Sequence, residues 1–453
     1  MAVIELDLTA ESGPAPTAPP PAHRYRLPGL VLVVVLVLTA GGAAPVLPVL
    51  WRYLGAVPAP GGPEAPFQLT GGQVYTIAVS EFERAITAWS LTEPPRELWR
   101  KSLTDEATSS DDIWMNGIDA QQAGDAVLLS DGSRTTVADA GTGGTRWTSL
   151  TPITPLPGNR LGVVQEHKFR AGTVYDQASG EPGMLYFSST GEPHTQPPLR
   201  TDVRGVDLTT GRPLWTVSAP GSVDVMVAPG GEPDVLLLSS DRLRRIDGET
   251  GTIEAGVSLP AIDGTRPMSG GVVDGLMRVD YGSQGVVTSK ANHSAETLER
   301  LWSRPVPEVV LDPVGCYGLF CTGDRRALDV LDPRTGAVRW RAPSDVDLMS
   351  HGGYVIEVAS ETGLPVRLVD PVTGRTRVDL SGWRAEVIGD ADQPIVLRRS
   401  LDAGASEFGV VLSRRDAVQP LGLTGGPVSD CTSDESHVVC RTDGGLRIWA
   451  YQG

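Results

Sequence analysis

Several features of common functional classes are scarce or missing in this sequence. Lysine occurs only at positions 101, 168 and 290, and the 38 Lys and Arg residues are outnumbered by 55 Asp and Glu, for a formal charge of -17. Phosphate recognition needs clustered basic side chains, so this balance argues against a nucleic-acid partner. The sequence has no Gly-x-Ser-x-Gly nucleophile elbow and no glycine-rich stretch with a phosphate-loop lysine. The six histidines show no metal-ligand spacing.

One long apolar run lies near the N-terminus. Residues 27–50 contain no charged side chain, and their centre, from Leu30 to Leu38, is continuously aliphatic. A helix of about 20 residues crosses the hydrocarbon core of a bilayer, and this run is longer than that. The sequence therefore predicts one transmembrane helix over residues 27–50, which would be the protein's contact with the membrane.

The flanking charges predict the orientation of that helix. His23, Arg24 and Arg26 precede it and only Arg52 follows closely, so the positive-inside rule favours a cytoplasmic N-terminus and an extracytoplasmic remainder. A cleavable signal peptide ending near 42–44 is the alternative. The long segment before the apolar run, and the apolar residues that continue after it, favour a single-pass anchor in the cell membrane.

Proline marks the segments on both sides of the predicted helix. Residues 1–26 combine several prolines with small and acidic residues and are expected to be a disordered cytoplasmic tail. Residues 51–66, rich in Pro and Gly, are expected to form an extended stalk. Beyond residue 66 no long stretch has helical apolar periodicity, and short strand-like runs alternate with turn signals.

An internal repeat dominates residues 67–453. Its full form, an Asp followed four residues later by Gly and eight residues later by Trp, occurs at Asp139, Gly143 and Trp147, at Asp207, Gly211 and Trp215, and at Asp332, Gly336 and Trp340. Asp247 with Gly251 and Asp370 with Gly374 keep the first two residues and lose the Trp. Degenerate copies lie near 89–99 and 297–302, and more doubtful ones near 413–420 and 446–449.

The residue types of the repeat indicate a hairpin. An Asp carboxylate can accept hydrogen bonds from the backbone N–H groups of a turn, and Gly adopts the positive φ that a tight turn requires. The Trp would then lie on the next strand, where its large face can pack against the neighbouring repeat. Each copy is expected to be a hairpin that contacts the next copy.

The spacing of the copies indicates a β-propeller. Asp207 and Asp247 are 40 residues apart, and Asp332 and Asp370 are 38 apart, which suits four-stranded blades around an axis. The chain after the apolar run accommodates seven or eight blades, and eight is favoured. The wider gap between Asp139 and Asp207 predicts an insertion around residues 151–201.

The Asp-x-x-Thr-Gly-x-x-x-Trp pattern resembles the tryptophan-docking repeat of quinoprotein-like propellers. That family includes pyrroloquinoline-quinone (PQQ) dehydrogenases and a non-enzymatic outer-membrane assembly propeller. The resemblance implies that a dehydrogenase would carry a Cys-Cys dipeptide on the cofactor, a Trp beneath its ring and acidic ligands for calcium. No Cys-Cys occurs, and Trp114, Trp383 and the acidic pairs at 111–112 and 390–392 fit packing or solvated turns better. No catalytic, cofactor or metal residue is therefore predicted.

Four cysteines occur as two local pairs. Cys316 with Cys321, and Cys431 with Cys440, are each followed by similar sequence, so the two pairs are expected at equivalent places in two blades. An even number of cysteines outside the membrane favours two disulfides in an oxidising compartment. Free thiols or a shared metal site are the alternatives.

These features favour an interaction or scaffold module in the cell envelope over an enzyme. A propeller presents broad faces and variable loops, and its partner here would be an envelope or membrane protein. The insertion is expected to carry the distinctive contacts, through Lys168, Arg170, Tyr175, Tyr186, Phe187 and His194. A ligand sensor and, with less support, a PQQ-dependent alcohol or sugar dehydrogenase are the alternative hypotheses.

Overall fold

The computed structural model describes residues 51–452 apart from 61–64, 80–83, 103–117, 132–133, 177, 179, 181–183, 311–314, 325–326, 352, 387–392, 402–403 and 412–415. The predicted tail (1–26) and the predicted transmembrane helix (27–50) lie outside the described residues, as do Trp114 and the acidic pairs at 111–112 and 390–392. Within the described residues, no helix combines the length and apolarity needed to cross a bilayer.

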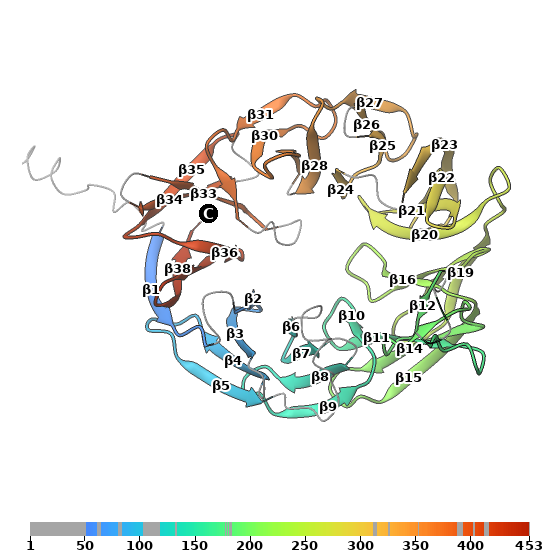
Figure 1. Ribbon diagram of the computed structural model, residues 1–453, viewed down its shortest axis with the longest axis horizontal. Coiled ribbons are helices and arrows are strands. Elements are labelled where there is room, and N and C mark those ends of the chain that lie inside the picture. Colours follow the sequence, from blue (N-terminus) through green and yellow to red (C-terminus); the bar gives the residue numbers. More distant parts are fainter. Residues whose placement is uncertain are drawn as a thin grey trace, which may run out of the picture. The chain divides into compact units, whose positions relative to one another are not determined.

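The described chain is an all-β propeller of nine blades that follow one another around a central axis (Figure 1). Blade 1 is β2 (Phe67–Thr70), β3 (Gln73–Val79), β4 (Arg84–Ser90) and β5 (Glu97–Ser102), and blade 2 is β6 (Ile118–Ala123), β7 (Ala126–Asp131), β8 (Arg134–Asp139) and β9 (Thr145–Ser149). Blade 3 is β10 (Ile153–Pro155), β11 (Leu161–Lys168), β14 (Arg200–Asp207) and β15 (Pro213–Pro220). Blade 4 is β16 (Asp224–Val227), β17 (Val235–Leu238), β18 (Arg242–Ile246) and β19 (Ile253–Ser258).

The second half of the ring contains one short blade and one blade made from both ends of the described chain. Blade 5 is β20 (Arg266–Val273), β21 (Leu276–Ser283), β22 (Val286–Ser294) and β23 (Arg300–Val310), and blade 6 is β25 (Cys321–Asp324), β26 (Ala327–Leu331) and β27 (Val338–Arg341). Blade 7 is β28 (Val346–His351), β29 (Tyr354–Ala359), β30 (Pro365–Val369) and β31 (Thr376–Asp379), and blade 8 is β32 (Arg384–Ala385), β33 (Ile395–Ser400), β34 (Ser406–Val411) and β35 (Val418–Thr424). Blade 9 is β36 (Ser429–Ser433), β37 (His437–Thr442), β38 (Gly445–Tyr451) and β1 (Trp51–Val57).

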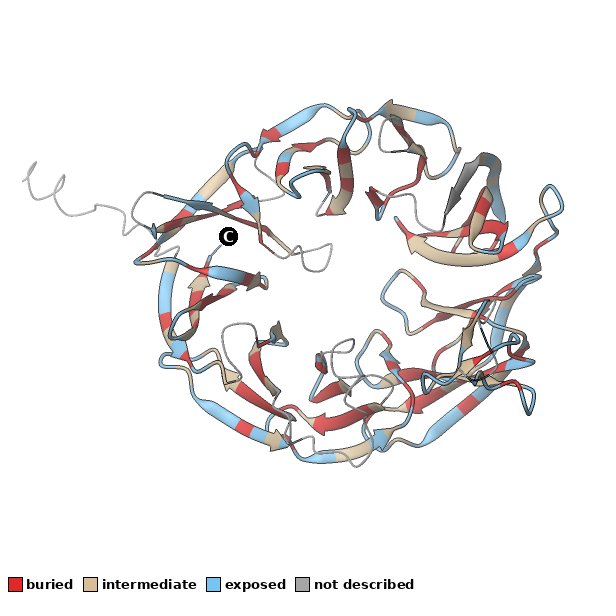
Figure 2. Cartoon of the chain, in the orientation of Figure 1, coloured by how far each residue is buried: buried red, intermediate tan, exposed pale blue. Residues whose placement is uncertain are grey.

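Each blade buries both of its faces against its neighbours. In β17 all four residues of the apolar run Val235–Leu238 are buried, whereas the outer strand β19 is mostly exposed. Figure 2 shows this gradient, with buried residues in the middle strands and exposed ones on outer strands. Middle strands such as β17 therefore appear in the sequence as short continuous apolar runs, whereas outer strands mix buried and exposed positions.

Among the residues that the structure describes, nine buried apolar clusters join the blades, one at each seam of the ring. One of them joins Tyr75 and Trp99 of blade 1 to Val127 and Leu129 of blade 2. The cluster that closes the ring joins Leu446 and Ile448 of blade 9 to Val74 of blade 1. The remaining seven occupy the intervening seams. The hydrophobic core is thus distributed over the seams, and each blade depends on both neighbours for burial.

The repeat Trp crosses these seams. Trp215 of blade 3 donates from Nε1 to the Gly248 carbonyl of blade 4 at 2.7 Å, and its side chain covers Gly251, where an added Cβ would lie 2.5 Å from it. Four other tryptophans make the same two contacts with the next blade, a hydrogen bond to a carbonyl and a packing contact on a glycine. They are Trp99 (Ala140 carbonyl and Gly143), Trp147 (Leu208 carbonyl and Gly211), Trp302 (Pro333 carbonyl and Gly336) and Trp340 (Pro371 carbonyl and Gly374). A motif in one blade is thus completed by the Trp of the preceding blade.

The repeat Asp organises the turn on which that Trp docks. Asp332 Oδ1 accepts the Arg334 and Thr335 N–H groups at 2.9 and 2.8 Å, and Arg339 donates to Oδ2 at 2.8 Å. Burial alone would raise the pKa of Asp332, but these hydrogen bonds lower it to about 2. Asp139, Asp207, Asp247 and Asp370 accept the equivalent backbone N–H at their own turns.

The predicted number of blades, seven or eight, is wrong, because the described chain forms nine. Of the regions that matched the repeat weakly, the described residues of 413–420 lie in blade 8 and residues 446–449 lie in blade 9. Their turns lack the full motif, so sequence comparison undercounts them. The structure also places Trp51–Val57, at the start of the predicted stalk, as outer strand β1 paired with β38. Leu54 and Val57 of this segment are buried, so this part of the predicted stalk is a strand of blade 9.

Candidate functional site

The insertion predicted around 151–201 is an excursion within blade 3. Strands β10 and β11 occupy much of its first part, and the chain leaves the blade after Lys168 and returns at Arg200, which pair with each other at the ends of β11 and β14. Residues 169–199 therefore project from neighbouring strands of one sheet. We refer to residues 169–199 as the insertion.

The insertion is folded around its own contacts. β12 (Tyr186–Phe187) pairs with β13 (Pro193–His194), and Val174 forms a further bridge to His194. The His194 ring stacks on Phe169 with centroids 3.7 Å apart and an angle of 2° between the planes, and its Nδ1 lies 3.0 Å from Thr173 Oγ1. These contacts hold the described part of the insertion together at the ends of the two middle strands of blade 3, β11 and β14.

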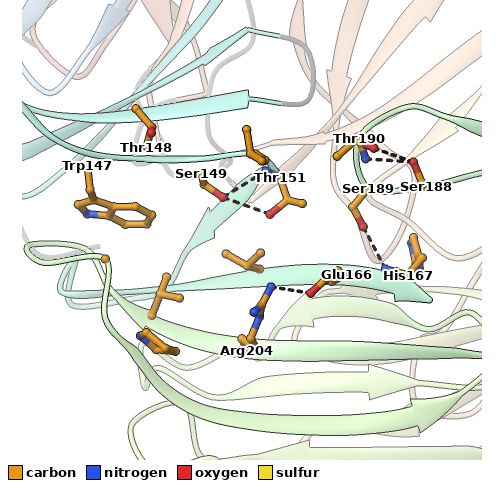
Figure 3. Close-up of a pocket in the computed structure, with 15 residues that line it drawn as sticks. Trp147, Thr148, Ser149, Thr151, Glu166, His167, Ser188, Ser189, Thr190 and Arg204 are labelled. Atoms are coloured by element: carbon orange, nitrogen blue, oxygen red, sulfur yellow. Dashed lines mark hydrogen bonds and ion pairs between the residues drawn. The ribbon is translucent and has the colours of Figure 1, made fainter.

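A pocket of about 470 Å³ lies where the insertion meets blades 2 and 3 (Figure 3). Its apolar lining comes from Trp147, Leu150, Val164, Val206 and Pro213, and its hydroxyl lining from Thr148, Ser149, Thr151, Ser188, Ser189 and Thr190. The last three residues belong to the turn between β12 and β13. We call this space the insertion pocket.

An ion pair on blade 3 supplies the charges of the insertion pocket. Glu166 on β11 accepts from Arg204 on β14 at 2.7 Å and also contacts Lys168 (Figure 3 shows the first contact). The two strands pair directly, so the sheet fixes this arrangement. Nearby, Arg200 lies 3.2 Å from Asp202, and the hydrogen bond from Ser218 lowers the pKa of Asp202. Glu166 can balance only one of the two basic side chains that contact it, which leaves one excess positive charge at this ion pair, in a chain of net charge -17.

His167 is a polar, uncharged part of the same lining. Its Nδ1 lies 2.9 Å from Thr201 Oγ1, which itself donates to the Gly221 carbonyl at 2.7 Å, so Nδ1 carries the proton. Burial lowers the pKa of His167, which keeps the ring neutral at pH 7. The His167 N–H donates to Ser189 Oγ at 3.1 Å and ties the insertion turn to β11 (Figure 3).

Four exposed apolar side chains lie on the described part of the insertion, and a fifth lines the pocket beside it. Among the described residues, Leu150, Val174, Met184, Phe187 and Leu199 expose between 49% and 64% of their surface. Leu150 lines the insertion pocket, and Phe187 directly precedes the turn that forms part of its wall. We call these five residues together with the insertion pocket the insertion face.

The residues predicted to make contacts on the insertion have different roles in the structure. Phe187 and Arg170 are exposed, whereas Lys168 is held by Glu166. His194 is buried in the insertion core, and the Tyr175 hydroxyl donates to the Gly180 carbonyl at 2.9 Å. Tyr186 is half-buried in β12. Sequence reasoning missed Glu166, Arg204 and the serine-rich turn, because alternation within strands does not show which polar residues face each other across blade 3.

The two predicted disulfides are confirmed, Cys316 with Cys321 and Cys431 with Cys440. Their expected equivalence is wrong. Cys431 and Cys440 join β36 to β37 within blade 9, whereas Cys316 lies on β24 (Cys316–Tyr317), which pairs in parallel with β28 of blade 7. The bond to Cys321 on β25 therefore links the sheets of blades 6 and 7.

Trp383, considered as a possible cofactor support, packs in the seam between blades 7 and 8. It is buried, and the Arg399 guanidinium lies 4.6 Å from its ring centroid. Within the described residues, no group of three or more His, Cys, Asp or Glu side chains is arranged to hold a metal ion.

Comparison with known proteins finds no matching family model and no matching curated protein. Solved structures similar to the chain include BamB from Moraxella catarrhalis, at 12% identity and a TM-score of 0.40 over 89% of this chain and 98% of that one. The computationally designed Ika8 protein matches at 13% identity and a TM-score of 0.41 over 88% and 99%, and Sqt1 of Saccharomyces cerevisiae at 12% and 0.39 over 90% and 97%. At these values the matches carry no argument about function.

Proposed function

We propose that this protein is an interaction module that binds a partner protein through the insertion face. The observation that carries the proposal is the set of exposed apolar side chains on the insertion, four in its described part, together with the exposed Leu150 in the lining of the insertion pocket. Exposed apolar side chains gathered beside a pocket are typical of surfaces that become buried in a complex.

The polar groups of the insertion face suit an apolar segment that also carries a carboxylate. Phe187 and Leu150 would supply the apolar anchors, since such residues gain most from losing their water. Ser and Thr hydroxyls of the insertion pocket can donate to and accept from a partner backbone. The excess positive charge near Arg204 would favour an acidic group on the partner.

We further propose that the propeller works outside the cytoplasm, tethered by the sequence predicted to span the membrane at 27–50. The two disulfides support this placement, since such bonds persist in oxidising compartments. The partner would then be an envelope or membrane protein, and the module would act as a scaffold at the membrane surface.

A ligand-sensing role and a PQQ-dependent dehydrogenase are the alternative hypotheses. A sensor would bind a small molecule in the insertion pocket, whose volume of about 470 Å³ lies in the range of ligand sites. A dehydrogenase would reduce an artificial acceptor when supplied with PQQ, calcium and an alcohol or sugar. We propose no catalytic role, and acceptor reduction by the folded protein would contradict us.

Substitution of the apolar anchors tests the proposed function. After proximity labelling in cells has identified a membrane neighbour, Phe187→Glu and Leu150→Glu should each weaken its binding by about 30-fold, as expected for loss of a roughly 2 kcal/mol hot spot. Affinity would be measured with purified protein. Val338→Glu, on the exposed outer strand β27 of blade 6, is the matched control because Val338 is also about half exposed.

The control variant should bind as the unchanged protein does, and all three variants should keep the unfolding temperature of the unchanged protein. Equal losses at positions 187 and 338, or no loss at 187 and 150, would contradict the assignment of the insertion face.

A further inference from the structure

The seam between blades 4 and 5 lacks the docking Trp. In the repeat, the Trp lies four residues after the Gly, as with Gly211 and Trp215, and that position in blade 4 is Ala255. The docking Gly of blade 5 is also replaced. Leu298 occupies it with φ 60° and donates its N–H to the Ser294 carbonyl at 2.9 Å, in the way that Gly211 donates to Asp207. This seam therefore has neither the indole nor the glycine that the indole covers.

A cavity of about 220 Å³ lies at this seam. Leu259 and Pro260 line it from the end of blade 4, and Tyr281, His293 and Leu298 line it from blade 5. Tyr281 and His293 expose 0% and 2% of their surface and belong to the deepest layer of the blade. One water molecule has about 30 Å³ of liquid volume, so the cavity has room for a small organic molecule. We call it the seam cavity.

Two buried polar atoms in the lining of the seam cavity have no hydrogen-bond partner. They are the Tyr281 hydroxyl and His293 Nε2. His293 Nδ1 lies 3.0 Å from the Leu298 carbonyl, which can only accept, so Nδ1 carries the proton and Nε2 is an acceptor. Burial lowers the pKa of His293 and raises that of Tyr281, so both side chains are neutral at pH 7. Buried polar groups are normally paired, so a polar molecule bound here, water included, would supply the hydrogen bonds that these two atoms lack.

The mouth of the seam cavity carries one charge of each sign, from Arg300 and Glu299. Arg300 lines it, is exposed, and pairs with His293 across β22 and β23. Its charge acts on both buried groups, lowering the pKa of each. Glu299 and Ser258 also lie at the exposed rim. A ligand that reaches from floor to mouth would thus meet an acceptor, a hydroxyl and a guanidinium, with the Glu299 carboxylate beside the guanidinium.

We propose that the seam cavity binds a small hydroxycarboxylate. A ligand hydroxyl donates to His293 Nε2, the Tyr281 hydroxyl donates to a ligand oxygen, and the carboxylate faces Arg300. The apolar side chains of Leu259 and Leu298 contact the carbon chain. This site lies in a different seam from the insertion face, so it does not depend on the proposed function.

Titration of the full chain with glycerate tests the proposal, with glycerol and propionate as probes that lack the carboxylate or the hydroxyls. Ligand-observed NMR and thermal shift should show saturable glycerate binding with a Kd of about 1 mM or tighter, at least tenfold tighter than either comparison probe. No saturation by glycerate at tenfold higher concentration, as expected if the cavity holds ordered water only, would overturn it.

Two variants locate the binding. Tyr281→Phe removes only the hydroxyl and should weaken glycerate binding at least tenfold, while Tyr451→Phe removes a buried hydroxyl from another seam and should leave it unchanged. The double variant Ala255→Trp with Leu298→Gly restores the docking pair and should fill the cavity, so that it melts at a higher temperature and no longer binds glycerate. Unchanged glycerate binding in Tyr281→Phe or in the folded double variant would overturn the assignment.

Discussion

A chain that begins at Pro58 is expected to lose the folded propeller, whereas a chain that begins at Trp51 should keep it. The difference between the two is strand β1, which pairs with β38 from Trp51 opposite Tyr451 to Val57 opposite Leu446. β1 is the outer strand of blade 9, so its removal leaves that sheet with three strands at the place where the ring closes.

The buried side chains of β1 explain why the expected effect is large. Leu54 and Val57 expose only 3% and 2% of their surface, and full burial of such a side chain is worth about 1.5–3 kcal/mol. Trp51 stacks against both Phe408 and Trp449, with ring centroids 5.0 and 5.5 Å away. Together these contacts approach the free energy of unfolding of a typical folded domain, which is roughly 5–15 kcal/mol.

Urea unfolding and gel filtration of the two chains would measure this effect. The chain from Trp51 should unfold cooperatively, and the chain from Pro58 should aggregate or show no transition. Addition of a peptide covering 51–57 should restore part of the folded signal, since an extended peptide can complete a sheet edge. Identical unfolding curves for the two chains would show that β1 does not close the ring.

Gly251→Ala is expected to destabilise the propeller more than Gly275→Ala. Both glycines have nearly the same left-handed backbone, with φ of 73° and 72°, so both substitutions incur the roughly 1–2 kcal/mol cost of that conformation for an L-residue. Only at Gly251 does the new Cβ meet a side chain, Trp215, at 2.5 Å, whereas nothing lies within 4 Å at Gly275. Overpacking adds about 1–3 kcal/mol, so the difference between the two variants should be of that size.

Denaturant midpoints of the two glycine variants give this difference directly, provided that the slopes agree. The indole fluorescence of Gly251→Ala should also change, since the Trp215 ring must move. Equal midpoints would show that the Trp does not depend on the bare glycine, and the description of the seams as docking contacts would then be incorrect.

The all-β repeat architecture could be predicted because its chemistry is local. An Asp that accepts turn N–H groups, a Gly with positive φ and a Trp on the next strand lie within nine residues, as at Asp207, Gly211 and Trp215. The blade count could not be predicted in the same way. Blades 8 and 9 lack this local pattern, and β1 joins blade 9 from the opposite end of the chain.

The location of the insertion could be read from a gap in the repeat, but the chemistry of its face could not. The Glu166 to Arg204 pair joins strands separated by the whole insertion, and their contact depends on the register of β11 against β14. The seam cavity is different, because the sequence itself shows Ala255 in place of the repeat Trp and Leu298 in place of the repeat Gly. They become informative once each Trp is known to dock on the following blade.

Site-specific photo-crosslinking tests the central claim, that the insertion face is the binding surface, most directly. A photoreactive phenylalanine analogue would replace Phe187 in one protein and Val338 in another, both exposed on the described surface. In cells, crosslinking from position 187 should give one discrete product with the partner, which excess unlabelled propeller competes away, and position 338 should give none. Products of equal yield from the two positions, or a product from position 338 alone, would contradict the account.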